Sequence, residues 1–387
     1  MTMAVRNWRV DERPDAIRVS ADVGDTNLWF TLPPGTRAPE AADSFCAMAL
    51  IPAMALGEDL DLSALPPLTA GYVERLEAVQ EIWACWNPFL RHVEIRSSAG
   101  DAPPVAAAGT VAFFSGGIDA VFTALARRPV LDRLVLINGF DFSMSPDEFT
   151  AALTRTSRLA DALGLPLATI ETNWIQFTRH HGIARNTTFG SCLAALGLAL
   201  ASERVIIGSS NSYARLTPMG SHPILDPLWS NGATSVEHHG SHATRNEKLM
   251  TIADHPELLR ELWVCHVNPV ANCGTCPKCL RFRLALALLG KERLAFPGVT
   301  DDPAVAWCGV IRYRSERAFL PEMIALARAR GRDDVARRLI RAERGVRMRG
   351  FLRDVDTLFL GGALHRRTAT AEASDLYPWG RGPLPES

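Results

Sequence analysis

The sequence predicts an α/β protein: a parallel sheet with helices on both faces, preceded by a small α+β domain and followed by a helical region. Between residues 110 and 208, short and nearly continuous apolar runs alternate with helical patterns. Such runs are typical of parallel strands buried on both faces. Residues 17–20 instead alternate apolar and polar side chains, as in a strand with one exposed face.

The first predicted domain covers residues 1–100 and the second covers residues 108–295. A stretch rich in Ser, Ala, Gly and Pro, residues 97–109, predicts the linker between them. Within the first domain the patterns predict strands and helices in turn. The strands are expected at 17–20, 28–32 and 92–96, and the helices at 41–56 and 72–86.

In the second domain, strands are expected at 110–114, 134–137, 166–171 and 204–210, and helices at 121–126, 145–163 and 189–201. Ligands of parallel α/β sheets bind beyond the carboxyl ends of the strands. The residues that follow these strands should therefore meet at one rim: 115–119, 138–141, 172–173 and 209–211. A stretch rich in Gly, Pro, Ser and His, 213–242, is expected to form a loop.

Ser115, Gly116, Gly117, Ile118 and Asp119 form a predicted turn between a strand and a helix. Backbone N–H groups and the helix N-terminus can bind phosphate at such a turn, and glycines allow a close approach. The serine hydroxyl can donate to a phosphate oxygen, and the aspartate could cap the helix, order the loop or hold Mg²⁺. No lysine follows, so this is not the G-x-x-x-x-G-K-[ST] loop. On the residues alone, an ordinary glycine turn explains the pattern equally well.

Four cysteines, Cys265, Cys273, Cys276 and Cys279, predict a closed and structural Zn²⁺ site, because thiolates at two-residue gaps can complete a tetrahedral shell. His266 is a competing ligand, and an iron–sulfur cluster is the alternative. The other four cysteines lie in apolar contexts and are expected to be buried thiols. They are Cys46, Cys85, Cys192 and Cys308.

Two further features carry weaker signals. His238 and His239 could serve metal or acid–base chemistry, but packing of one ring with exposure of the other is favoured. Arg245 and Lys248 lie one helical turn apart and could face phosphates together, or could lie on a solvated helix face.

Composition limits the class of protein. The chain has 387 residues, 47% hydrophobic residues and a net charge of −1, which fits a globular protein without a global attraction to nucleic acid or anionic lipid. No apolar run is long enough to span a membrane, and the N-terminus lacks the apolar core of a signal peptide. We expect a cytoplasmic protein with reduced cysteines.

Two motifs carry a resemblance to a known family. The run 115–119 resembles the S-G-G-x-D-S signature of the PP-loop ATP pyrophosphatases, with Ala120 in place of the last serine. Further along, the pattern Cys…Cys-Gly-x-Cys-x-x-Cys-Leu-Arg is similar to that of the 7-cyano-7-deazaguanine synthases of the queuosine pathway. The matching residues are Cys265, Cys273, Gly274, Cys276, Cys279, Leu280 and Arg281. The resemblance covers roughly residues 110–290.

The resemblance implies an adenine nucleotide alpha hydrolase-like PP-loop fold with ATP, Mg²⁺ and Zn²⁺ as cofactors. It implies adenylation of a carboxylate with release of pyrophosphate, followed by displacement of AMP by ammonia or an amine to give an amide or a nitrile. The cofactor-binding residues would be Phe114, residues 115–119 and Asn138. The catalytic candidates are Ser115 and Asp119, with Arg245 and Lys248, chosen for their spacing, as weaker candidates for stabilising the developing charge. Zinc would lie next to the active site.

The expected partner is a small carboxylate or the terminus of a peptide or protein. The extra N-terminal domain suggests a substrate other than the deazaguanine acid. A homodimer is considered, whereas nucleic acid is not favoured, although arginines are frequent between residues 312 and 353. Two other functions stay open: a tRNA- or nucleobase-modifying PP-loop enzyme, and a non-catalytic nucleotide-binding scaffold, which Ala120 favours.

The third predicted domain, residues 296–387, is a helical region with a tail. Helices are expected at 319–329 and 334–342, with a break near Gly331, and a loose tail at 369–387.

Overall fold

The computed structural model describes residues 2–102, 108–141, 143–311 and 314–360. The predicted tail at 369–387 and part of the predicted linker, residues 103–107, lie outside the described residues. Contacts group the described residues into two compact units, one ending at Arg245 and one beginning at Asn246. Each unit is described separately below.

The first unit begins with a five-stranded mixed sheet in the order β3-β2-β1-β4-β5. Pairing is antiparallel between β1, β2 and β3, and parallel from β1 to β4 and from β4 to β5. The bounds are β1 (Thr2–Glu12), β2 (Ile17–Val23), β3 (Thr26–Leu32), β4 (Asp59–Leu62) and β5 (Ile95–Ser97). The patterns predicted β2 and β3, but not β1 or β4. Only Met3 and Val5 of β1 are buried, so this strand carries almost no alternating signal.

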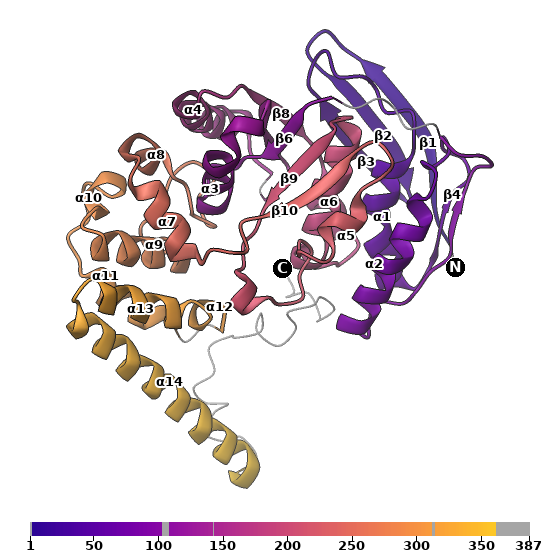
Figure 1. Cartoon of the computed structure of the whole chain (residues 1–387). Coiled ribbons are helices and arrows are strands. Elements are labelled where there is room, and N and C mark those ends of the chain that lie inside the picture. The colour runs from indigo at the N-terminus through magenta and orange to yellow at the C-terminus, as the bar shows by residue number, and fades with distance from the viewer. Residues whose placement is uncertain (1, 103–107, 142, 312–313, 361–387) are drawn as a thin grey trace. The chain divides into compact units, whose positions relative to one another are not determined.

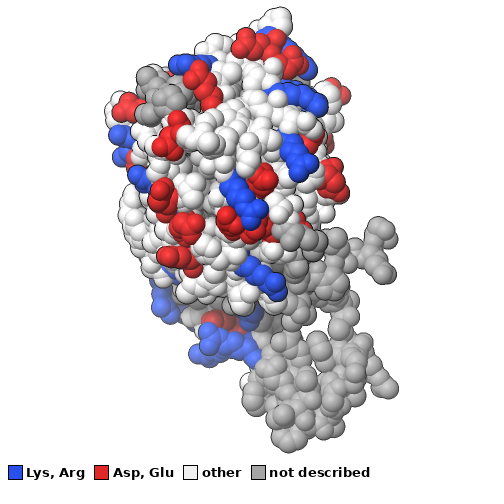
Figure 2. Space-filling model, turned by 90° about the vertical axis from the view of Figure 1, so that its right-hand side faces the viewer, with Lys and Arg blue, Asp and Glu red and all other residues white. Residues whose placement is uncertain are grey.

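The outer side of this sheet is exposed. Figure 2 views the molecule from the side of the N-terminal sheet and shows Lys and Arg interspersed with Asp and Glu among uncharged residues. Ion pairs on this sheet follow the same mixed pattern, as in the contacts of Arg96 with Asp59 and Glu94. The described residues of this face therefore carry charges of both signs side by side.

Two helices, α1 (Asp43–Leu56) and α2 (Tyr72–Trp86), follow in this part of the chain. α1 is buried over most of its length and packs against α6 (Arg185–Ala199) of the next layer. One continuous hydrophobic core includes residues of both sheets, from Val19 and Phe30 to Val135 and Val205. The predicted boundary near residue 100 thus separates two sheets that share a core, and the three-domain division stays a prediction.

The second sheet of the first unit is parallel throughout, in the order β10-β9-β6-β7-β8. α3 and α4 lie on one side of it, and α5 and α6 on the other (Figure 1). This confirms the predicted parallel sheet with helices on both faces. The strands are β6 (Thr110–Phe113), β7 (Arg133–Asn138), β8 (Leu167–Glu171), β9 (Arg204–Gly208) and β10 (Ser235–His239). The helices are α3 (Ile118–Arg127), α4 (Pro146–Leu163), α5 (Trp174–His180) and α6 (Arg185–Ala199).

The prediction of a loop over residues 213–242 was wrong in part. This stretch contains β10 and two short 3-10 helices, η2 (Tyr213–Arg215) and η3 (Asp226–Trp229). β10 is an edge strand whose only buried apolar residue is Val236. Its polar residues gave no strand pattern, and its pairing with β9 supplies the order instead.

The chain reverses direction across this sheet between β6 and β9. From β6 it proceeds to β7 and β8 on one side, then crosses through α5 and α6 to β9 on the other side of β6. Such a switch point leaves a crevice at the carboxyl ends of the strands, where α/β proteins bind ligands. The N-terminal sheet also contacts this rim. β3 bonds to the residues after β8, with Thr172 Oγ1 donating to the carbonyl oxygen of Trp29 (2.7 Å).

The second unit is helical within the described residues, as predicted for the C-terminal region. Gly331, at φ +69°, separates α13 from α14 at the predicted break. The helices are α7 (Arg245–Ala253), α8 (Pro256–Glu261), α9 (Pro277–Leu288), α10 (Glu292–Ala295), α11 (Pro303–Val310), α12 (Arg314–Arg317), α13 (Leu320–Ala329) and α14 (Asp333–Leu360). Two α14 arginines form exposed ion pairs, Arg338 with Asp302 and Arg347 with Glu343.

Across the described part of both units, none of the helices combines the length and apolar character needed to cross a bilayer.

Candidate functional site

The turn after β6 has the geometry of an anion-binding loop. Gly116 adopts φ +77°, a left-handed conformation that favours glycine, and a Cβ there would lie 3.1 Å from the Leu159 side chain. Gly117 precedes α3 in an extended conformation, and no side chain caps this helix. Ser115 is exposed, and its Oγ accepts from the Gly117 N–H at 3.4 Å. An uncapped helix N-terminus behind a glycine turn presents N–H groups to an anion.

Asp119 and Arg245 face each other at this turn. The Arg245 guanidinium donates to Asp119 Oδ2, and both side chains are mostly buried, 20% and 13% exposed respectively. Asp119 belongs to the first turn of α3, whereas Arg245 follows β10. The structure thus brings together three of the four residues predicted to be catalytic, counting Ser115. The fourth, Lys248, belongs to the second unit, where it is buried.

The other predicted cofactor-binding residues have structural contacts. Phe114 is buried, and its N–H donates to the Val135 carbonyl at 2.7 Å. The Asn138 side chain donates to Glu171 and accepts from the Met144 N–H, both at 3.4 Å. These contacts order the ends of β6 and β7 beside the turn.

The rim is closely packed where β7 and β8 end. Gly139 adopts φ +88°, and a Cβ at this position would lie 1.7 Å from the Thr172 carbonyl oxygen. Only glycine fits there. The Thr172 N–H in turn donates to the Asn138 carbonyl at 3.0 Å. This tight contact fixes the path of the loop that leads to Asp141.

Arg185 is a rim residue that the sequence did not reveal. It is the first residue of α6, which has no side-chain cap, and it pairs with Asp141 after β7. The rings of Phe140 and Phe189 lie 5.2 and 5.6 Å from its guanidinium carbon. Its Nε is buried without a hydrogen-bond partner, while the side chain as a whole is 36% exposed. Helices of such sheets begin at the rim, so Arg185 lies on the face opposite α3. The one sequence signal is an arginine at the start of an apolar helix.

A buried polar chain lies at the ends of β9 and β10. His238 Nδ1 contacts Asp226 Oδ2 at 2.6 Å, and His238 Nε2 contacts Ser241 Oγ at 3.1 Å. Ser241 Oγ contacts Ser209 Oγ at 2.8 Å, and Ser209 Oγ donates to the Asn211 carbonyl at 2.6 Å. Of the histidine doublet, therefore, His238 packs and forms hydrogen bonds, while His239 is half-buried and its Nδ1 lies 3.2 Å from Thr123 Oγ1.

The second unit holds the predicted cysteine cluster. The four sulfur atoms of Cys265, Cys273, Cys276 and Cys279 all lie within 4.8 Å of one another, and no other cluster of this kind is found among the described residues. Two of the separations, Cys265 to Cys276 and Cys273 to Cys279, are 3.9 Å. A tetrahedral ZnS₄ centre with bonds of about 2.3 Å requires sulfurs about 3.8 Å apart. The donor set and its spacing therefore fit a metal such as zinc.

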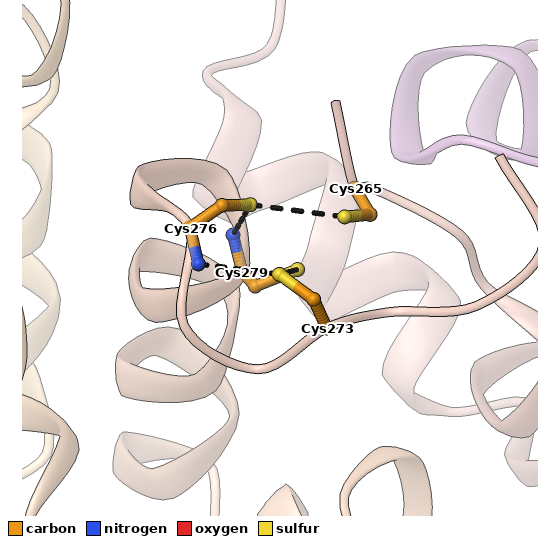
Figure 3. Close-up of side chains that lie close together, drawn as sticks. All are labelled: Cys265, Cys273, Cys276 and Cys279. Carbon is orange, nitrogen blue, oxygen red and sulfur yellow. Dashed lines mark hydrogen bonds between the residues drawn. The ribbon is translucent and has the colours of Figure 1, made fainter. Parts of the chain in front are cut away.

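Backbone N–H groups support the thiolate form of these ligands. Figure 3 shows Cys276 and Cys279 on the first turn of α9, with Cys273 just before it and Cys265 on a separate segment. N–H groups donate to the sulfurs of Cys265, Cys273 and Cys276 at 3.2 to 3.4 Å. Hydrogen bonds from the Cys279 thiol and from nearby backbone hold the pKa of Cys276 well below its usual range. Cys276 is thus ready to lose its proton to a cation, whereas its hydrogen bond to Cys279, followed by burial, raises the pKa of Cys279.

Arg283 stabilises the cysteine loop through hydrogen bonds. Its side chain is 2% exposed and donates to the Gly274 carbonyl (3.1 Å), to Glu292 (3.0 Å) and to Asp301 (2.9 Å). Gly274 adopts φ +75°, which the tight turn between Cys273 and Cys276 requires. Of the four other cysteines, Cys46 and Cys192 are buried as expected. Cys308 is half-buried and Cys85 is exposed, so the expectation was wrong for Cys85.

The fold and site define an α/β protein with a candidate anion-binding turn at a topological switch point and a four-cysteine cluster. No protein-family model matches the chain, and no curated protein sequence matches it significantly.

Proposed function

We propose that this protein is an ATP-dependent adenylating enzyme of the PP-loop type. The observation that carries the proposal is the turn at residues 115–119: a glycine turn before an uncapped helix, located at the switch point of a parallel sheet, with Arg245 beside it. The motif resemblance adds the reaction. The enzyme would transfer AMP from ATP to a substrate carboxylate and release pyrophosphate. Ammonia or an amine would then displace AMP.

In this proposal, the N–H groups of the turn and the Ser115 hydroxyl hold the departing pyrophosphate. Asp119 would hold Mg²⁺, which neutralises charge on the phosphates. Arg245 is mostly buried, so its charge would act on the pyrophosphate in a low-dielectric setting, where charge stabilisation is strong. Phe114 and Asn138 would support the nucleotide pocket.

Arg185 is our candidate for orienting the acceptor carboxylate. An arginine binds a carboxylate through two parallel N–H bonds, and the partly exposed Arg185 guanidinium already binds one carboxylate, that of Asp141, which an acceptor could replace. Its position at the start of α6, on the face opposite α3, would place the acceptor across the crevice from the phosphates. The acceptor would be a small carboxylate, or a peptide or protein terminus.

We assign zinc to the four-cysteine cluster, as a structural ion. Four protein thiolates close a tetrahedral shell, and a closed shell leaves no position for a substrate. Cys265, Cys273, Cys276 and Cys279 would hold it, and the ion would stabilise the loop that Arg283 also contacts.

Pyrophosphate exchange tests the proposed reaction. The protein would be incubated with ATP, labelled pyrophosphate, Mg²⁺ and a panel of carboxylates, and label would be expected in ATP with at least one acid. Ser115→Ala should slow the exchange, whereas Arg127→Gln should not. Arg127 is the control because it also belongs to α3, but it lies at the end of the helix far from the turn, where it pairs with Glu237 of β10. Absence of exchange with every acid, together with no ATP binding by calorimetry, would reject the proposal.

A second candidate is a nucleotide-binding protein without turnover. The ion pair with Arg245 favours it, because the carboxylate proposed to hold Mg²⁺ already has a cationic partner. Ala120 favours it as well, since the family signature has a serine there. This candidate predicts ATP binding that does not depend on Mg²⁺ and no ATP consumption above that of an Asp119→Ala variant.

A further inference from the structure

The outer face of α14 carries a row of arginines. The helix packs against α11 and α13 of the same unit, and Val335 and Leu339 of its inner face are buried. At about 3.6 residues per turn, positions 337, 341 and 344 lie on the side of the helix opposite these buried residues. Each of the three positions is an exposed arginine. We call Arg337, Arg341 and Arg344 the arginine row.

The three guanidinium groups of the row have no carboxylate partner. None of them forms an ion pair or a side-chain hydrogen bond with the described part of the chain. Two neighbouring arginines of α14 differ in this respect. Arg338 pairs with Asp302 at 3.0 Å. Arg347 pairs with Glu343 at 2.6 Å. The row therefore presents three uncompensated positive charges along about 10 Å of the helix axis, at about 1.5 Å per residue.

The charge of the whole chain conceals this local excess. Nucleic acid was not favoured because the net charge is only −1. Between residues 328 and 348, however, the chain has eight arginines and three acidic residues. Two of these acids, Asp334 and Glu343, already pair with arginines. Salt screens exposed charges beyond about 8 Å at physiological ionic strength, so acidic residues far from the row do not cancel its positive potential.

The side chains around the row indicate the kind of partner. A helix that lies on a membrane inserts an apolar face, but the apolar face of α14 is buried within its own unit, as at Leu339. Protein interfaces have an apolar core, whereas the outer face described between residues 333 and 348 offers one large apolar side chain, that of Met348. Interfaces with nucleic acids are polar and positively charged. The row therefore fits a nucleic acid better than a lipid surface or a protein.

The form of the nucleic acid follows from the same helix. Single strands stack their bases on aromatic side chains, and residues 333–348 contain none. An A-form RNA duplex has a deep, narrow major groove, whereas the major groove of B-form DNA is about 12 Å wide and admits an α-helix. Along the length of the row, such a duplex carries about six phosphates, at one charge per about 1.7 Å.

We propose that the arginine row binds the phosphate backbone of double-stranded DNA. Each guanidinium can donate two parallel N–H bonds to a phosphate. Contacts to phosphates carry no sequence information, so the binding should depend little on the DNA sequence. This inference goes beyond the proposed adenylation and does not depend on it.

Fluorescence anisotropy with a short labelled DNA duplex of random sequence tests the proposal on the full chain. With one phosphate for each guanidinium, the slope of log K against log salt should be about −2.7, which is about a 40-fold loss of affinity between about 50 and 200 mM salt. The triple variant R337Q/R341Q/R344Q should lose this salt dependence and bind more than about tenfold more weakly at the lower salt. Wild-type affinity in the triple variant, or no binding by the wild type at the lower salt, would overturn the proposal.

The matched control is R6Q/R9Q/R91Q, which removes the same charge from three exposed arginines of the first unit. It should bind DNA as the wild type does, and an equal loss in both triple variants would show that net charge, rather than the row, governs binding. Arg341→Gln alone should reduce the slope by about 0.9 and provides the test if the triple variant folds poorly.

Competition distinguishes DNA from the other partners of a positive surface. Unlabelled duplex DNA should displace the labelled duplex better than single-stranded RNA, poly-glutamate or vesicles that contain phosphatidylserine. If one of these competitors is the better one, the assignment to DNA is wrong, and the row binds RNA, an acidic protein or a lipid surface instead. The assays contain no ATP, so their outcome is separate from that of pyrophosphate exchange.

Discussion

The Asp119 carboxylate is paired with the Arg245 guanidinium, which joins the first turn of α3 to the segment after β10. If Arg245 acts on the pyrophosphate, Arg245→Gln should reduce pyrophosphate exchange about 10²- to 10³-fold, as expected when one charge-stabilising group is lost. It should also lower the free energy of unfolding by about 1–3 kcal/mol, because Asp119 loses its ion pair with Arg245.

The double variant Asp119→Asn/Arg245→Gln separates the two effects. Removing both charges should restore most of the lost stability, but exchange should stay low. Urea unfolding and the exchange assay on the same preparations measure both quantities. Exchange that recovers along with stability would show that Arg245 has only a structural role.

Arg185→Gln should weaken binding of the acceptor while leaving ATP binding unchanged. The guanidinium carbon lies 5.2 Å from the Phe140 ring and 5.6 Å from the Phe189 ring. Loss of a charged hydrogen-bond partner corresponds to about a 10- to 100-fold rise in KM for the carboxylate. Arg18→Gln is the matched control, because Arg18 also lies over an aromatic ring, 4.0 Å from Trp29, but on the N-terminal sheet. Equal effects of the two variants, or loss of ATP binding in Arg185→Gln, would argue against an acceptor site.

Cys276→Ser should abolish stoichiometric zinc binding and lower the melting temperature of the second unit. Cys276 is both a ligand and the N-cap of α9, so its loss removes a quarter of the shell and alters the start of the helix. Metal content by mass spectrometry and thermal unfolding with and without a chelator provide the measurements. Cys308→Ser, a half-buried thiol of the same unit outside the cluster, should keep the metal. Detection of iron instead of zinc would confirm that the cluster binds a metal, but would show that the assignment of zinc is wrong.

Patterns within single elements could be read from the sequence, and contacts between distant elements could not. The apolar runs located β6 to β9, and Ser145 with Glu148 forms the capping box at the start of α4. The cysteine spacing identified a converging cluster, because two-residue gaps leave few alternatives. By contrast, β10 is held by pairing with β9 and carries almost no pattern of its own.

The polar chain shows the same limit more clearly. Asp226 and His238 are twelve positions apart, and Ser209 lies further away along the chain. Their meeting depends on β9 and β10 being neighbours, which no local periodicity encodes. The pairing of Asp119 with Arg245 spans 126 positions and was likewise invisible, although each residue had been selected separately.

Arg283→Gln should destabilise the second unit by about 1–3 kcal/mol, because the Gly274 carbonyl and the partly buried Glu292 lose their cationic donor. The side chain is 2% exposed and bonds to Gly274, Glu292 and Asp301. Arg338→Gln is the comparison. Its pair with Asp302 is exposed, and such pairs contribute about 0–1 kcal/mol. Urea unfolding of both variants measures the difference in the free energy of unfolding. Similar small decreases in the two variants would show that the Arg283 contacts contribute little.

Acidification should destabilise the first unit in part through His222. Burial, with His238 as a second cause, lowers the pKa of this ring in the folded state, so the unfolded chain takes up a proton at a higher pH than the folded chain does. The free energy of unfolding should therefore decrease as the pH falls below the unfolded value of about 6.5, until the folded ring also titrates.

His222→Asn removes the titrating group and retains an acceptor where Nδ1 meets the Ile224 N–H. Unfolding measured between about pH 8 and 5 should then show a shallower loss of stability in this variant. The exposed His242, replaced by Asn, should leave the slope unchanged. An identical slope in wild type and His222→Asn would show that this ring does not contribute to the acid sensitivity.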